Sequence, residues 1–373
     1  MYRRLREEAP LYYNERFDFF AVSRADDVER VLTDHETFIS GRGAFLDFIR
    51  ADVTMPPGML IFEDPPSHTR HRKVLSRVFT PRRMAELEPQ IRAYCARSLD
   101  PLVGAKRFDF VADLGAQVPM RTISMFLGIP DTDQEEVRDQ SAGSMRTEPG
   151  QPMQIKEVGN PEMYAEYIDW RAEHPSDDLM TTLLNVEFED ETGTVRRLTR
   201  DEILTYCMLI AGAGNETSAR LISWSGKVLA DHPDQRRQLV EDPSLIPNAI
   251  EEILRFEPPG HNFARCVTRD IELYGTTVPE GSVMVVLLGA ANRDERRFPN
   301  GDSFDIHRNI EKHITFGYGI HYCLGAALAR LQGRVVLDEV LKRFPDWEID
   351  IDNAHLTSAS VVRGWDTLPA VIS

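Results

Sequence analysis

The stretch Phe316-Gly-Tyr-Gly-Ile-His321-Tyr-Cys323-Leu-Gly325 stands directly before a strongly helical pattern that runs from Ala326 to Phe344. Three glycines around one cysteine allow the backbone to curl so that amide N–H groups point at the sulfur, and the N-terminus of the following helix favours an anion. Both effects favour the thiolate, the form of cysteine that ligates a metal or attacks as a nucleophile. A lone cysteine before a helix is equally compatible with a buried structural residue.

A second motif lies inside a long helix. The capping box Thr199-Arg-Asp-Glu202 predicts the start of this helix, and its pattern continues to about Asp231, a length of roughly 48 Å. Within it stands Ala211-Gly-Ala213-Gly214-Asn215-Glu216-Thr217. Two glycines inside a helix cost about 1 kcal/mol each relative to alanine, so they indicate close approach of a flat ligand, a local opening of the hydrogen-bond ladder, or tight helix packing. The acid and the alcohol of Glu216-Thr217 can together hold water and relay protons.

A third motif is Glu252-Ile-Leu-Arg255, on a helix predicted from about Pro247 that must end before Pro258-Pro259. Glu252 and Arg255 share a helix face at this spacing. Taken alone, the spacing indicates an exposed ion pair worth a few tenths of a kcal/mol.

Taken in order, these three motifs resemble those of the cytochrome P450 family. The pattern FGxGxHxCxG is similar to the family's haem-binding loop, in which the cysteine is the thiolate ligand of the haem iron; AGx[DE]T and ExxR are its other signatures. The resemblance covers most of the chain from Asp64 to Ser373. It implies a mainly α fold with small β-sheets (α+β), one large triangular domain over residues 1–373, and haem b between the long central helix and the helix after Cys323.

The resemblance also implies roles for individual residues. Glu216 and Thr217 would be catalytic, Cys323 would ligate the iron, and Glu252 with Arg255 would support the core beneath the haem. The segment Asp64-Pro-Pro-Ser-His68-Thr-Arg-His-Arg72 is similar to the family's HxxxR stretch, whose side chains bind haem propionates; without the motif, exposed helix-surface residues would be the better interpretation. The full set of implied cofactor contacts is His68, Arg72, Ala213, Gly214, Arg265, Phe316, Gly317, His321, Cys323 and Gly325.

The implied reaction inserts one oxygen atom from O2 into a hydrophobic small molecule, with electrons from NAD(P)H supplied through a ferredoxin reductase and a ferredoxin. Thiolate donation would favour O–O cleavage. The alternatives are a peroxygenase that uses hydrogen peroxide, which the Glu216-Thr217 pair disfavours, and a non-catalytic haem-binding or ligand-binding protein. Apolar residues in four segments predict a terpenoid, steroid, fatty acyl or polyketide substrate; these segments are Ser40 to Phe62, Leu209 to Thr217, Pro259 to Phe263 and the tail near Val361.

Composition excludes several other classes of protein. The 43 Lys and Arg residues against 60 Asp and Glu residues give a net charge of −17, which disfavours nucleic acid as a partner. Four scattered cysteines argue against disulfides and a zinc knuckle and fit the cytoplasm. The best apolar run, Val283 to Ala291, is too short for a membrane span, and we expect a monomer.

One local charge pattern runs against the net charge. No acidic residue stands between Pro65 and Arg83, and by resemblance this segment and the helix after Cys323 lie on the face nearest the thiolate. The sequence therefore predicts that an acidic ferredoxin docks on a basic surface there. We define this basic surface as Arg70, Arg72, Lys73, Arg77, Arg82, Arg83, Arg330 and Arg334.

Along the chain, the patterns predict a helix-rich middle between β-rich ends. A strand is expected at Phe19 to Val22, a helix at Ala25 to Thr33, a long loop from Ser40 to Pro66, and mostly helices from Thr69 to about Leu239. Short strands are expected between Val267 and Val286 and in the tail from Leu356. The stretch from Arg146 to Pro161 is rich in Gly and Pro, where related chains often carry longer helices over the substrate entrance.

Overall fold

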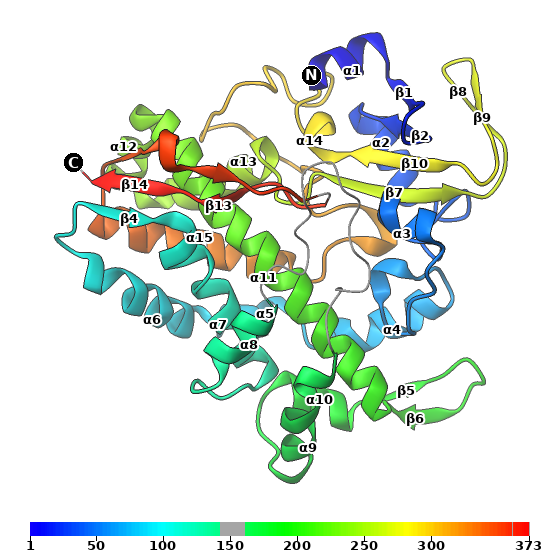
Figure 1. Ribbon diagram of the computed structural model, residues 1–373, viewed down its shortest axis with the longest axis horizontal. Coiled ribbons are helices and arrows are strands. Elements are labelled where there is room, and N and C mark those ends of the chain that lie inside the picture. The colour runs from blue at the N-terminus through cyan, green and yellow to red at the C-terminus, as the bar shows by residue number, and fades with distance from the viewer. Residues whose placement is uncertain (142–160, 360, 373) are drawn as a thin grey trace.

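A computed structural model describes residues 1–141, 161–359 and 361–372 (Figure 1). Nearly all of the Gly- and Pro-rich stretch 146–161 lies outside these residues. The helices are α1 Tyr2–Glu8, α2 Ala25–Thr33, α3 Leu46–Ala51, α4 Ser67–Ser76, α5 Pro81–Ala85, α6 Glu88–Leu99, α7 Val118–Leu127, α8 Gln134–Ser141, α9 Ala165–Glu173, α10 Leu179–Asn185, α11 Arg200–Asp231, α12 Pro233–Glu241, α13 Ile246–Phe256, α14 Leu288–Ala291 and α15 Ala326–Arg343. The strands are β1 Leu11–Asn14, β2 Phe19–Val22, β3 Phe38–Ile39, β4 Arg107–Asp109, β5 Glu187–Glu189, β6 Val195–Arg197, β7 Asn262–Val267, β8 Ile271–Leu273, β9 Thr276–Val278, β10 Val283–Leu287, β11 Trp347–Ile349, β12 His355–Leu356, β13 Trp365–Thr367 and β14 Pro369–Ile372.

The largest sheet joins the start of the chain to its last third. Its strand order is β1-β2-β10-β7-β3, with β2 and β10 parallel and the other neighbours antiparallel. Figure 1 shows this sheet with α1, α2 and α14 at the upper right, apart from most of the helices. Val22 on β2 and Met284 and Val286 on β10 point to the same face of the sheet. There they join a buried cluster with Val28 of α2 and Phe38 of β3, so this face of the sheet packs against α2.

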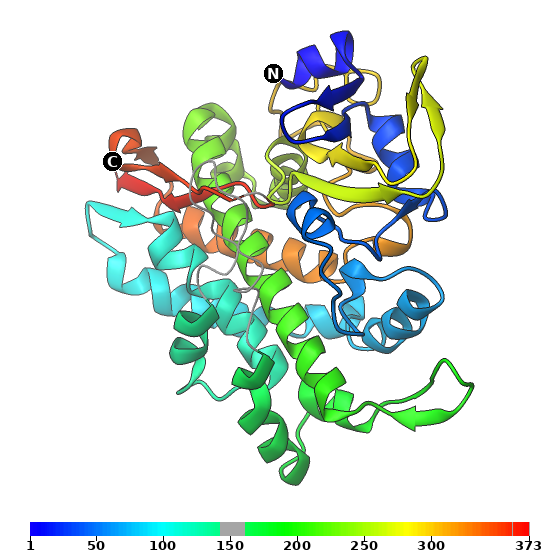
Figure 2. The same ribbon diagram turned by 45° about the vertical axis from the view of Figure 1, so that its right-hand side comes forward.

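The central element is α11, which runs diagonally across the molecule in both views (Figures 1 and 2). Its start confirms the predicted capping box, since Thr199 Oγ1 accepts from the Glu202 N–H at 3.3 Å and Glu202 Oε2 accepts from the Thr199 N–H at 2.7 Å. Helix α11 packs against α7, α13 and α15, and α15 packs against α6. These contacts place the helix after Cys323 against the central helix.

A smaller sheet fixes the end of the described chain to the helices. Its order is β11-β14-β4, so β14 is the central strand and pairs antiparallel with both neighbours. The Trp224 Nε1–H of α11 donates to the Arg363 carbonyl at 2.9 Å, and Arg220 of α11 donates to the Trp365 carbonyl. The tail thus forms part of the wall beside α11.

The helix and strand predictions hold at most positions, with two exceptions. The predicted loop from Ser40 to Pro66 is wrong in part, because Leu46–Ala51 forms α3 and Leu60–Phe62 forms a 3₁₀ turn. The helix-rich middle also contains the short strands β4, β5 and β6. Both misses concern elements of six residues or fewer, which are too short to show a periodic pattern. None of the helices in the described part of the chain combines the length and apolar character that a membrane span requires.

Candidate functional site

The cysteine loop is folded back on itself. The Cys323 N–H donates to the Phe316 carbonyl at 2.9 Å, and Gly317 and Gly319 between them have φ values of +71° and +66°. A Cβ on Gly319 would also stand 3.0 Å from the Leu32 carbonyl oxygen. Both the positive φ and this close approach therefore require glycine at position 319. Helix α15 starts immediately after Gly325, as predicted. The Cys323 side chain is exposed, whereas Cys95, Cys207 and Cys266 are buried.

The Cys323 sulfur receives a backbone hydrogen bond that favours the thiolate, as the sequence predicts, but burial opposes this effect. Although solvent reaches the side chain, its deep position among protein atoms raises the pKa of the Cys323 thiol above the ordinary value. A hydrogen bond from the Gly325 N–H and the charges of Arg72 and Arg330 lower this pKa but do not outweigh the burial. The hydrogen bond and nearby charges of the loop are therefore not sufficient to deprotonate the Cys323 thiol. Coordination to a metal cation would deprotonate it.

Four basic side chains from distant segments meet beside this loop. The rings of His68 on α4 and His321 lie 4.4 Å apart, and Ser40 Oγ lies 3.1 Å from His321 Nε2. Arg72 donates to the Tyr322 carbonyl at 2.5 Å. Arg265 on β7 is 4 % exposed and, with His68 and Arg72, lowers the pKa of His321, which burial already depresses, to about 2. We call His68, Arg72, Arg265 and His321 the cation cluster after its two arginines; the two histidines, with their lowered pKa values, are neutral hydrogen-bonding groups at pH 7.

The cation cluster has no ion pair among the described residues. The Asp64 carboxylate acts on Arg265 and His68 by its charge, but its two oxygens accept from the Ser40 and Gly41 N–H groups. Burial lowers the pKa of Arg265 to about 10. Both ring nitrogens of His68 are buried without a hydrogen-bond partner, and burial lowers the pKa of His68 to about 4. Buried guanidinium groups are costly without a counter-ion. The donor set therefore fits a ligand with two carboxylates, as a haem has in its propionates.

The middle of α11 is the part of the central helix that leaves space open. Ala213 is exposed although Ala211 and Ser218 on either side are buried, and a Cβ on Gly212 would meet nothing within 4 Å. Gly214 differs, because its Cβ would stand 2.7 Å from Ile123 Cδ1. Tight helix packing thus explains Gly214, while Gly212 borders open space. The helix ladder continues through both glycines, so the local opening considered from the sequence does not occur.

The acid and the alcohol of α11 have different surroundings. Thr217 Oγ1 donates to the Ala213 carbonyl at 2.8 Å, which leaves its oxygen able to accept a hydrogen bond. Glu216 accepts from Arg220 Nη2 at 2.5 Å, and the same nitrogen lies 3.5 Å from Asp366 Oδ1 on β13. Sequence reasoning missed Arg220, although its i,i+4 position after Glu216 was a usable signal.

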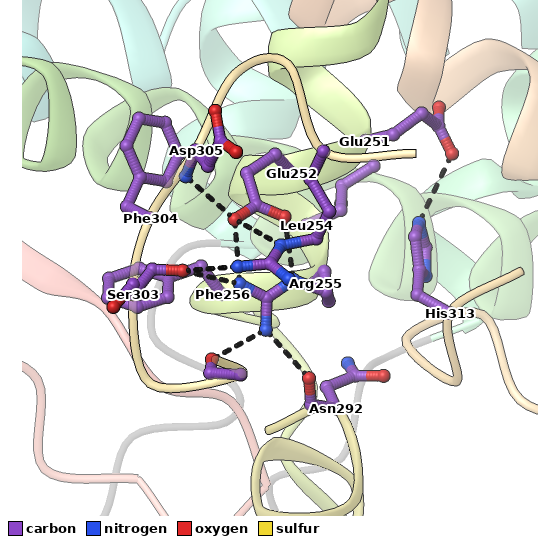
Figure 3. Close-up of polar contacts among 12 residues, drawn as sticks. Glu251, Glu252, Leu254, Arg255, Phe256, Asn292, Ser303, Phe304, Asp305 and His313 are labelled. Atoms are coloured by element: carbon purple, nitrogen blue, oxygen red, sulfur yellow. Dashed lines mark hydrogen bonds and ion pairs between the residues drawn. The ribbon is translucent and has the colours of Figure 1, made fainter. Parts of the chain in front are cut away.

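The Glu252 and Arg255 pair is buried, so the exposed ion pair considered from the sequence is wrong. Both side chains are 0 % exposed and are joined by two hydrogen bonds of 2.6 and 2.7 Å. Figure 3 shows the Arg255 guanidinium reaching carbonyls of the loop that includes Asn292 and Ser303, at 2.8 and 3.1 Å. Arg308 and the Asp305 N–H complete the bonding of Glu252. The pair ties α13 to the loops that precede the cysteine loop.

An apolar cluster gathers most of the predicted substrate-lining segments. Its buried members come from α3, the 3₁₀ turn, the residues directly before each of these two elements, and the tail. Met208, Leu209 and Phe263 pack against them. The Phe45 ring lies 5.7 Å from Phe263 and 5.8 Å from Phe62. We call this set the aromatic cluster; its buried members are Ala44, Phe45, Phe48, Met59, Phe62, Val361 and Val362.

A sequence model of the family described as Cytochrome P450 matches residues 153–359. The chain belongs to the cytochrome P450 family. The putative cytochrome P450 123 of Mycobacterium tuberculosis is 38% identical over 99% of this chain and 92% of its own length. A vitamin D(3) 25-hydroxylase of Pseudonocardia autotrophica is 35% identical over 94% of this chain and 87% of its own length. A solved mutant of P450 EryK in complex with erythromycin B has a TM-score of 0.89 and 30% identity, and the match covers 100% of this chain and 95% of that one. The predicted fold class, monooxygenase family and haem cofactor are thereby confirmed.

The basic surface of this P450 is partly neutralised by carboxylates elsewhere in the chain. Arg82 pairs with Glu86 at 3.2 Å, Arg83 with Asp177 at 3.6 Å, and Arg330 with Glu251 at 2.7 Å. A groove of about 540 Å³ lies among α5, α13 and α15. Its lining includes Pro81, Met84, Asn248, Glu251, Arg330 and Arg334.

Proposed function

We propose that this P450 inserts one oxygen atom from O2 into a hydrophobic small molecule, using electrons that a ferredoxin and a ferredoxin reductase deliver from NAD(P)H. The observation that carries the proposal is the cation cluster, which lacks carboxylate partners among the described residues beside a loop with an exposed thiol. When bound, haem b supplies the activation of O2, and a thiolate ligand favours O–O cleavage. The chain's residues then have three tasks: holding the cofactor, supplying protons and placing the substrate.

Cofactor binding falls to the residues of the loop, of α4 and of β7. His68, Arg72, Arg265 and His321 would donate to the propionates, and the negative charge of the propionates would supply the carboxylate partners that the two arginines lack. Cys323 is the iron ligand. Phe316, Gly317 and Gly325 would shape the loop around it. The exposed Ala213 would let α11 approach the haem, whereas Gly214, which the sequence also assigned to cofactor binding, serves the packing of α11 against Ile123. Glu252 and Arg255 hold the supporting core and take no part in the reaction.

Proton supply falls to Glu216 and Thr217. The Thr217 hydroxyl, which donates to the Ala213 carbonyl, can accept from a water molecule and hold it beside the open part of α11. Glu216 is held by Arg220 and must exchange that contact to pass a proton. A peroxygenase needs no such relay, so the presence of the pair favours the O2-dependent reaction.

Substrate binding falls to the aromatic cluster. Apolar side chains from α3, the 3₁₀ turn, β7 and the tail meet there, which favours a bulky hydrophobic skeleton such as a terpenoid, steroid, fatty acyl or polyketide. The relatives named above include a vitamin D(3) hydroxylase and a P450 solved with erythromycin B, in line with that choice. We further propose that residues 1–373 act as a single domain and a monomer; the cytoplasmic location stays a prediction.

The test is the spectrum of the reduced, carbon monoxide-treated protein. We expect the red-shifted Soret band of a thiolate-ligated ferrous carbonyl in the wild type and its loss in Cys323→Ala. The matched control is Cys266→Ala, a buried cysteine outside the loop, which should keep the band. A histidine-type band in the wild type would refute the assignment of Cys323. Product formation with O2 and reduced ferredoxin, but not with peroxide alone, separates the monooxygenase from the peroxygenase and from a non-catalytic binder.

A further inference from the structure

Three titratable side chains beside the cysteine loop form a network that takes no part in cofactor binding, proton supply or substrate binding as proposed above. His313 is 3 % exposed, and its Nε2 lies 3.2 Å from Glu251 Oε2. Arg330 on α15 donates to both oxygens of Glu251, from Nε at 2.7 Å and from Nη2 at 2.9 Å. Figure 3 shows the His313 ring directed at Glu251 on α13, beside the buried Glu252 and Arg255 pair. One carboxylate thus holds side chains from two other segments.

Arg330 in turn contacts the cysteine loop on both sides of its folded-back turn. Its guanidinium lies 4.5 Å from the centre of the Phe316 ring, and Nη1 donates to Tyr322 Oη at 3.3 Å. Phe316 is the residue whose carbonyl accepts the Cys323 N–H, and Tyr322 directly precedes Cys323. The charge of Arg330 also lowers the pKa of the Cys323 thiol, against the larger raising effect of burial. Arg330 therefore acts on the loop both by contact and by charge.

The orientation of Arg330 depends on Glu251 and His313. A bidentate carboxylate fixes the plane of a guanidinium, which a single contact does not. Burial raises the pKa of Glu251, but hydrogen bonds from His313 and Arg330 outweigh it, so the pKa of Glu251 is lowered to about 2 and the group stays ionised. His313 is itself fixed, because its Nδ1 accepts from the Thr315 N–H at 3.3 Å and its ring lies 5.6 Å from that of Phe316.

We propose that Glu251 and His313 are positioning residues that hold Arg330 against Phe316 and Tyr322, and that Arg330 thereby sets the electrostatic field at the Cys323 sulfur and the reduction potential of the haem. This rests on the proposed role of Cys323 as the iron ligand. A fixed positive charge near the sulfur stabilises the more negative, ferrous state, so it raises the potential. A guanidinium that is free to turn toward solvent has a smaller effect, because water screens it.

The experiment measures the haem midpoint potential by spectroelectrochemical titration of the full-length holoprotein, without a redox partner. We expect Arg330→Gln to lower the potential. Glu251→Asp keeps the charge but draws the carboxylate back by one methylene, and we expect it to lower the potential in the same direction by a smaller amount. Arg334→Gln is the matched control, since Arg334 is exposed, lies one turn further along α15 and lines the same groove. We expect no shift in this variant.

Each outcome decides the proposal. An unchanged potential in Arg330→Gln, or a shift of equal size in Arg334→Gln, overturns the role of Arg330. An unchanged potential in Glu251→Asp overturns the positioning role of Glu251. The ferrous–carbonyl spectrum is recorded for the wild type and every variant. A wild type without the thiolate band refutes the assignment of Cys323 as the iron ligand, whereas unchanged potentials in a protein that shows the band refute the role of Arg330. If Arg330→Gln binds no haem, Glu251→Asp and His313→Gln carry the test, and both must lower the potential.

Discussion

Buried positive charge is the most informative feature at the residue scale. Arg255 and Arg265 are both almost fully buried, yet Arg255 meets Glu252 and three carbonyls, whereas among the described residues Arg265 donates only to the Ala264 carbonyl. A satisfied guanidinium fixes the core, and an unsatisfied one points to a missing anion. The same residue type thus supports the core at Arg255, whereas at Arg265 it has the unsatisfied charge on which the proposed cofactor-binding role rests.

The Thr217 hydroxyl provides a residue-scale prediction about the coupling of electron use to product formation. Thr217→Ala removes a group that can hold water at the open part of α11, so product per NAD(P)H consumed should fall several-fold and peroxide should rise. Thr217→Ser keeps the hydroxyl and should behave like the wild type. Equal coupling in the alanine and serine variants would show that the hydroxyl carries no proton. Haem content and substrate-induced Soret shifts check that binding is retained.

Spacing alone predicted which residues matter but not how deeply they lie. The Glu252 and Arg255 spacing is the same for an exposed pair and for a buried one, and the covering carbonyls come from about 37 to 48 positions later in the chain. The pairing of Glu216 with Arg220 could be predicted from the helix, whereas the approach of Asp366 could not, because it depends on where β13 packs. The partners of Arg83 and Arg330 in the basic surface were missed for the same reason, whereas the pairing of Arg82 with Glu86, four positions later, could have been predicted.

At the scale of elements, glycines in α11 and α15 allow neighbouring elements to pack closely against these helices. Gly226 lies against the Phe110 ring, where a Cβ would stand 2.6 Å from two ring carbons, and Gly333 of α15 would meet Leu221 at 3.0 Å. These contacts allow close helix packing at the level of the core. The termini of the long helices were predictable from caps and prolines, whereas α3 was not, since six residues complete fewer than two turns.

The packing of α11 leads to a prediction that compares two identical substitutions. Gly226→Ala forces the Phe110 ring, held by Trp347 at 5.4 Å, to move, and overpacking of this kind costs about 1 to 3 kcal/mol. Gly214→Ala meets only the end of the Ile123 side chain, which can turn, and gains about 1 kcal/mol of helix propensity. The thermal midpoint of the holoprotein should therefore fall by a few degrees in the first variant and stay near the wild type in the second. Equal midpoints would contradict this account of the packing.

At the scale of the whole molecule, charge is unevenly distributed. The net charge is −17, yet Lys73, Arg77 and Arg334 are exposed, with no ion pair among the described residues, on or beside the segments that carry the cation cluster and Cys323. An acidic ferredoxin would be repelled by the molecule as a whole and attracted at the basic surface, which favours one docking orientation. Arg83 contributes less to this attraction, because Asp177 lies 3.6 Å away.

This distribution predicts how electron transfer responds to charge and salt. Arg77→Glu should slow the first electron transfer from an acidic ferredoxin several-fold without altering substrate affinity. The effect should weaken as salt rises, since the screening length is about 10 Å near 0.1 M. Arg16→Glu makes the same charge change in the exposed turn between β1 and β2 and should leave the rate unchanged. A transfer rate indifferent to salt and to Arg77→Glu would rule out the basic surface as the docking site; stopped-flow reduction under carbon monoxide measures it.

The position of β14 as the central strand of its sheet has a consequence for folding during synthesis, because both of its neighbours precede it in the chain. The Leu368 N–H donates to Asp109, which stands 259 positions earlier in the chain. Asp109 is the last residue of β4, the strand with which β14 pairs. At synthesis rates of 5–20 residues per second, β4 waits roughly 13 to 50 s for its partner strand. During that time the helices α6 to α11 can already pack, while β4 offers an unpaired edge to other chains. Slower emergence of the last third of the chain lengthens the time for which this edge is unpaired.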